Sequence, residues 1–165
     1  AGDAVSQTAQ TYLPALPDTA RLRPARVALR RRLLLLGLGT GVLAAIGSVL
    51  PLAAPRLAAL FCADGAVQAG ILRLLPSLSA CLFCYSFGSS LEGLLVAGRD
   101  HAFVGRLYAA APFVTLAFMR ALRGCAGCAD GAVAAWTAYA SFFAVRVAVF
   151  GGRALRRSPV AADAN

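Results

Sequence analysis

Residues 74–101 read LLPSLSACLFCYSFGSSLEGLLVAGRDH, and this stretch decides the fold. It is apolar and long enough to cross a bilayer as a helix, which takes about 20 residues. One charged side chain, Glu92, lies inside it, and a charge at that depth costs roughly 2.5 to 3.5 kcal/mol on insertion scales. A carboxyl kept at that cost normally faces a bundle interior or a water-filled path. We therefore expect a membrane helix with Glu92 on its inner face.

Glu92 continues a polar face of this expected helix. At helical spacing, the residues on the same side as the acid are Ser89, Gly88, Tyr85 and Cys81. Two interpretations fit this pattern: a site that binds a proton or a cation, and a neutral glutamic acid that joins two helices through a hydrogen bond. The first is our working hypothesis, and it makes Glu92 the candidate cation or proton site.

The composition is that of a membrane chain rather than a soluble domain. Hydrophobic residues make up 59% of the chain and charged residues 14%, and the mean hydropathy is +0.72. We therefore expect an all-α fold, a polytopic membrane helical bundle with about four transmembrane helices. These helices are expected at about 33–55, 72–98, 102–122 and 131–152.

The segments outside the expected bundle, which covers residues 33–152, are more polar. Residues 1–32 are expected to hold the end of a preceding helix and an arginine-rich cytosolic connector, although the first 14 residues fit an N-terminal coil equally well. Residues 153–165 are expected to form a cytosolic tail. Because Met119 is the only methionine, we interpret the chain as a fragment. The connector abuts a membrane span and lacks interleaved aromatic residues, so we do not expect nucleic acid as a partner.

Glycine and proline positions shape the expected spans. Gly37 and Gly41 lie four residues apart in the first span and form a small-residue face suited to close helix packing. Pro76 is expected in the first turns of the second helix. Pro112 lies near the middle of the third, where it predicts a kink or an opening in the backbone hydrogen bonds.

Arginine is distributed unequally between the two faces of the expected bundle. One face carries Arg21, Arg23, Arg26, Arg30, Arg31, Arg32, Arg99, Arg106, Arg153, Arg156 and Arg157. The opposite face carries Arg56, Arg73, Arg120 and Arg123. Because loops rich in arginine stay on the cytosolic side, we expect both ends of the chain in the cytosol, or in the stroma of a plastid.

Arg146 is the second charge inside the expected membrane region. It lies seven residues before Arg153, as Glu92 lies seven residues before Arg99, so both charges are about 10 Å below the same face. Opposite charges in a medium of low dielectric constant cost less together than apart, so we expect Glu92 and Arg146 to approach each other or to share one aqueous cavity. The alternative is that Arg146 extends along the helix to the lipid headgroups.

An aromatic stripe leads up to Arg146 on the last expected helix. Trp136, Tyr139, Phe143 and Arg146 follow 3, 4, 3 spacing and therefore share one face. Such a stripe usually packs in the core, but an arginine at its end also fits a wall for a flat aromatic or anionic molecule. We take Arg146, Trp136, Tyr139 and Tyr85 as candidate substrate-binding residues.

The sequence offers little material for enzyme or metal chemistry. The pair Cys81/Cys84 lies mid-membrane and the pair Cys125/Cys128 in a connector, so a shared metal site is not expected. His101 is the only histidine and is expected to be a solvated turn residue. Serine occurs in no nucleophile-elbow context, and no phosphate-binding loop with lysine is present. We expect neither an enzyme nor a bound cofactor.

Three strings together resemble the closing helices of multidrug and toxic compound extrusion (MATE) transporters, most closely the plant plastid-envelope branch. They are SQTAQTYLP at 6–14, the arginine-rich connector before the glycine-rich span, and LEGLLVAGRD at 91–100. The resemblance implies a twelve-helix fold in two lobes, of which this chain would supply the end of helix eight and helices nine to twelve. It also implies H⁺ or Na⁺ as the coupling ion, and it matches Glu92 and Asp100 to acidic positions of the family. The N-terminal lobe is absent from this chain and would be its partner.

We therefore expect a fragment of a secondary active antiporter that exports small organic molecules, aromatic or anionic ones among them, in exchange for H⁺ or Na⁺. Its other partner would be the lipid bilayer, and the resemblance suggests the plastid envelope. The alternative is a four-span membrane scaffold or assembly protein that transports nothing, in which the same charges only specify packing.

Overall fold

The computed structural model describes residues 2–16, 19, 21–53, 62–122 and 131–156. These residues form helices and no strand, which confirms the expected all-α fold. The helices are α1 (Gly2–Tyr12), α2 (Arg23–Ala53), α4 (Gly65–Ala97), α5 (His101–Leu122) and α6 (Gly131–Arg156). All but α1 are long and apolar enough to cross a membrane, so the described chain is a multi-pass helical bundle.

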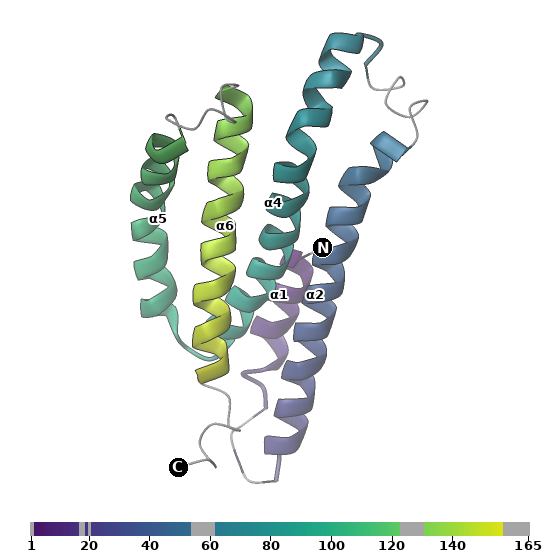
Figure 1. Ribbon diagram of the computed structural model, residues 1–165. Helices are drawn as coiled ribbons and strands as arrows, with labels where there is room; N and C mark the ends of the chain where they lie inside the picture. Colours follow the sequence, from purple (N-terminus) through teal and green to yellow (C-terminus); the bar gives the residue numbers. More distant parts are fainter. Residues whose placement is uncertain (1, 17–18, 20, 54–61, 123–130, 157–165) are drawn as a thin grey trace.

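Helix α4 lies at the centre of the bundle. It packs against α1 and α2 on one side and against α6 on the other, and α5 packs chiefly against α6 (Figure 1). The residues at the end of α4 fill two apolar clusters, one shared with α1 and α2 and the other with α5 and α6. The polar face of α4 is therefore covered by neighbouring helices where Glu92 lies.

Two helices begin earlier than expected from the sequence. The expected arginine-rich connector is helical from Arg23, because arginine favours helices and Pro24 falls in the first turn, where its missing N–H is tolerated. Helix α4 begins at Gly65, where the Asp64 side chain accepts a hydrogen bond from the Ala66 backbone N–H at 2.8 Å. Pro76 is therefore inside α4 and not in its first turns.

Glycines allow the helices of the α1–α2–α4 group to approach closely. A Cβ on Gly37 would lie 2.5 Å from the Ser90 Cβ, and one on Gly41 would lie 3.1 Å from the Phe83 carbonyl oxygen. The expected small-residue face of α2 is thus confirmed, with α4 as its partner. A Cβ on Gly93 would lie 2.5 Å from the Ser6 Cα, so α1 also rests directly on the backbone of α4.

A tight turn joins α4 to α5 and is bound to the end of α6. Arg99 adopts a left-handed conformation with φ of 60°, and the Asp100 backbone N–H donates to the Leu95 carbonyl at 3.0 Å. The buried Asp100 carboxylate accepts a hydrogen bond from Arg153 Nε at 2.9 Å. This ion pair joins the end of α6 to the hairpin that carries Glu92.

Many arginines gather at one end of the bundle. The start of α2, the α4–α5 turn and the end of α6 lie together at the lower end in Figure 1. Arg30 there donates a hydrogen bond to the Ala154 carbonyl at 2.5 Å, which satisfies one of the last carbonyls of α6. Arg73 and Arg120, near the other ends of α4 and α5, lie at the opposite end. The side of a membrane that each end faces stays a prediction.

Candidate functional site

Glu92 and Arg146 form an ion pair between α4 and α6. Arg146 Nη2 donates a hydrogen bond to Glu92 Oε2, and the side chains are 6% and 23% exposed, respectively. The expected approach of the two charges is therefore confirmed. Arg146 does not extend to the end of the bundle, so the snorkelling alternative does not hold for this structure.

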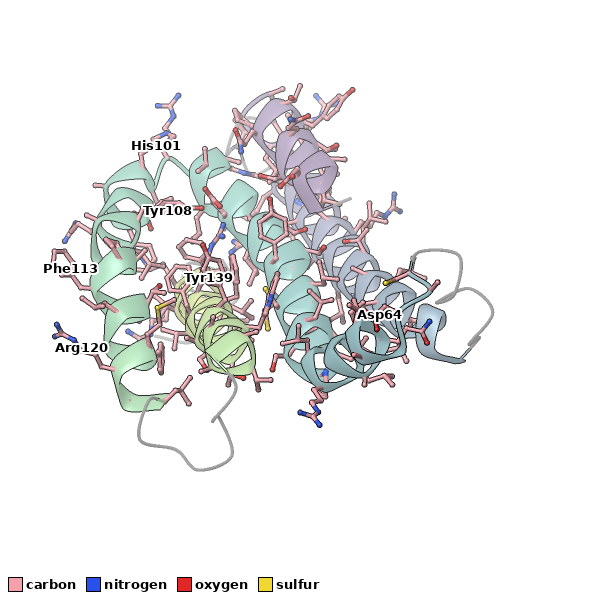
Figure 2. All side chains as sticks on the ribbon, turned by 90° about the horizontal axis from the view of Figure 1, so that it is seen from above. Asp64, His101, Tyr108, Phe113, Arg120 and Tyr139 are labelled. Carbon is pink, nitrogen blue, oxygen red and sulfur yellow. The ribbon has the colours of Figure 1, made fainter. Side chains whose placement is uncertain are left out.

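Tyr108 of α5 joins the pair. Its hydroxyl donates to Glu92 Oε2 at 2.7 Å, so one carboxylate oxygen accepts bonds from two helices. Figure 2 shows Tyr108 on the side of α5 that faces α4 and α6, whereas Phe113 and Arg120 point away from the bundle. Tyr108 was not among the expected site residues, although it follows Asp100 by eight residues, the same separation as between Glu92 and Asp100. That symmetry about a helical hairpin places both side chains at one depth.

Aromatic rings surround the Arg146 guanidinium. Its central carbon lies 5.2 Å from the Tyr108 ring centroid, 5.8 Å from that of Phe143 and 5.4 Å from that of Phe150. Arginine over aromatic faces gains electrostatic attraction, which grows where water is excluded. The rings therefore stabilise the positive charge of Arg146 at a depth where lipid does not solvate it.

Gly88 of α4 lies next to Arg146, at a distance where a methyl group would make ordinary van der Waals contacts. A Cβ at this position would approach Arg146 Nε to 4.0 Å and Val147 to 3.4 Å. Arg146 Nε is buried and has no hydrogen-bond partner among the described residues. An unpaired buried N–H costs free energy, so Arg146 stays one bond short of full satisfaction in this state.

The candidate substrate-binding residues are only partly brought together. Phe143 connects Arg146 to two of them, because its ring lies 5.5 Å from that of Tyr85, edge to face, and 5.8 Å from that of Tyr139. Both tyrosines are exposed, and the Tyr85 hydroxyl reaches Asp3 of α1 at 3.5 Å. Trp136 makes no ring contact with this cluster within the described part of the chain. The binding roles of all four residues stay predictions.

The other motifs lie away from this site. Cys81 and Cys84 sit within α4 as free thiols, and Cys125 and Cys128 lie outside the described residues. His101 is exposed at the start of α5, as expected of a residue beside the turn. These motifs therefore contribute no side chain to the cluster of Glu92, Arg146 and Tyr108 within the described residues.

Comparison of the chain with protein-family models, with curated proteins and with solved structures finds no match. The fold and the site define a multi-pass membrane helical bundle with a partly buried ion pair between α4 and α6, which Tyr108 of α5 joins through a hydrogen bond. The resemblance to MATE transporters therefore rests on the quoted strings alone.

Proposed function

We propose that this chain is the C-terminal part of a MATE-type secondary active antiporter that exports small organic molecules in exchange for H⁺ or Na⁺. The observation that supports this most is the Glu92–Arg146 pair inside the bundle, because ionisable residues within membrane spans mark ion and substrate pathways. Glu92 would bind the proton or cation, and Arg146, Tyr139 and Tyr85 would contact an aromatic or anionic substrate.

Binding of a proton to Glu92 changes the balance between helices. The neutral carboxyl attracts Arg146 less. The Arg146 guanidinium then lies in a poorly solvated place without its counter-charge, so a rearrangement that brings water or an anion to it becomes favourable. Arg146 of α6 and Tyr108 of α5 contact Glu92 directly. Tyr85 of α4 interacts electrostatically with Tyr108 and donates a hydrogen bond to Asp3 of α1. Since these groups belong to four helices, one proton can bias how α4 packs against α6.

The charge of the substrate decides the sign of the coupling. A cation that binds ionised Glu92 competes with the proton, and such competition is what exchange requires. An anion instead needs Arg146, which protonation of Glu92 releases, so anion and proton would bind together. The pair therefore supports exchange with H⁺ for a cationic substrate, whereas for an anion it predicts binding that tightens as the pH falls, which is joint transport.

Transport by the complete protein in sealed vesicles tests the role of Glu92. With an imposed pH gradient, uptake of tetraphenylphosphonium or benzenesulfonate above the level of protein-free vesicles is expected to depend on pH in the wild type and to lose that dependence in Glu92→Gln. Asp64→Asn is the control, because asparagine also caps helices and position 64 lies at the other end of α4. Transport by Glu92→Gln with unaltered pH dependence would rule the proposal out.

The scaffold alternative has its own support in the structure. The three polar groups of the cluster bind one another, and such a closed network can serve only to fix how three helices pack. In that case the complete protein would move neither probe, and Glu92→Gln would change stability alone. The sequence that precedes Ala1 in the gene offers an independent check, because eight further spans would favour the transporter.

A further inference from the structure

The outer face of α2 carries a groove that the ion-pair site does not use. The groove has a volume of about 670 Å³, within the range of small-molecule sites. It is lined by arginines and apolar side chains from the first turns of α2, among them Pro24, Val27, Ala28, Arg31, Arg32 and Leu35. The opposite side of α2 is the one whose Gly37 and Gly41 touch α4, so the groove faces away from the bundle.

Three arginines line this groove: Arg23, Arg31 and Arg32. Arg31 and Arg32 are both exposed, and they form no hydrogen bond or ion pair with the residues that the structure describes. Arg30, which precedes them, points to the other side and binds the Ala154 carbonyl. Adjacent guanidinium groups at this position match phosphate oxygens, to which arginine donates paired hydrogen bonds.

An exposed apolar stripe continues from the arginines along the same face. Arg31 is followed at 4, 3, 4, 4, 3 spacing by Leu35, Leu38, Val42, Ile46 and Val49, all of them exposed. Val42 is eleven residues beyond Arg31, a rise of about 16 Å. That rise is close to half of the roughly 30 Å hydrocarbon core, the depth of one leaflet. The face is therefore basic at the membrane boundary and apolar for the length of an acyl chain.

We propose that this face of α2 binds an anionic phospholipid, with the phosphate on Arg31 and Arg32 and an acyl chain along Leu35, Leu38 and Val42. The charge pattern favours a lipid over a partner helix, because a helix would have to bring its own carboxylate to the level of the arginines. The formal net charge of +9 also favours anionic lipids, which are found in the cytosolic leaflet. The proposal does not depend on transport.

Native mass spectrometry of the purified protein in micelles tests this site. Dioleoyl phosphatidylglycerol is expected to stay bound in preference to dioleoyl phosphatidylcholine, which has the same chains. Replacing both Arg31 and Arg32 by Gln is expected to weaken phosphatidylglycerol binding about 30-fold, from the usual contribution of two arginines near an anionic surface. Leu35→Ser keeps both charges and is expected to weaken it less.

The matched control removes the same charge at the other end of the bundle. Arg73 and Arg120 are also exposed, and replacing both by Gln is expected to leave phosphatidylglycerol binding unchanged. Equal loss in the two double variants, or no loss in the first, would overturn the proposal. Displacement of the lipid by glycerol phosphate at equal concentration would also overturn it, because the apolar stripe would then contribute nothing to binding. If the purified protein instead forms a dimer without lipid, and replacing Arg31 and Arg32 disrupts that dimer, the face binds a second copy of the chain and the proposal is overturned.

Discussion

At the scale of single residues, the hydroxyl of Tyr108 is the member of the cluster that can be removed with least disturbance. Tyr108→Phe deletes a bond to a carboxylate, and hydrogen bonds to charged groups contribute about 1.5 kcal/mol or more when they are shielded from water. Because Tyr108 is partly exposed, we expect a loss of about 1.5 kcal/mol in the free energy of unfolding, measured in mixed micelles.

Tyr139→Phe is the matched control for this change. The Tyr139 hydroxyl has no hydrogen-bond partner among the described residues, and the side chain is exposed to a similar degree. Its removal is expected to change the free energy of unfolding by less than about 0.5 kcal/mol. Equal losses for the two variants would mean that the bond from Tyr108 to Glu92 contributes nothing.

At the scale of elements, the contact of α1 with α4 depends on the absence of one methyl group. Gly93→Ala would place a Cβ 2.5 Å from the Ser6 Cα, a backbone atom that moves only if α1 moves. We expect a loss of about 1 to 3 kcal/mol in the free energy of unfolding, the usual cost of overpacking. Gly70→Ala in the same helix meets nothing within 4 Å and is expected to stabilise by about 0.4 to 1 kcal/mol. Thermal unfolding of the two variants tests the close approach of α1 to α4, because Gly93→Ala is expected to lower the midpoint temperature and Gly70→Ala to raise it.

At the scale of the whole molecule, the arrangement of the ends predicts a topology. In a cysteine-free background, His101→Cys reports on the arginine-rich end and Ala63→Cys on the opposite end, since both positions are exposed. A membrane-impermeant maleimide added outside intact cells is expected to label Ala63→Cys at once and His101→Cys only after the cells are opened, because arginine-rich ends stay in the cytosol. Labelling of both from outside would contradict the four-span topology.

Much of the architecture could be predicted because it depends on local properties. The length of the apolar runs located α5 and the end of α4 to within one residue, although α4 begins seven residues before its expected start. The cost of a charge in lipid singled out Glu92 and Arg146. Equal distances from the α4–α5 turn and the end of α6 placed the two charges at one depth. The early start of α2 was missed, because an arginine-rich segment outside the apolar run carries no hydropathy signal even when it is helical.

Tertiary structure alone decided which side chains meet. Tyr108 of α5 completes the cluster through its bond to Glu92 of α4, and no periodicity within one helix predicts that contact. Trp136 shares a face with Arg146 by spacing and still lies outside the cluster. The physical reason is that spacing fixes the depth of a residue and its direction relative to its own helix, whereas contact depends on how α4, α5 and α6 rotate against one another to bury a charge that lipid does not solvate.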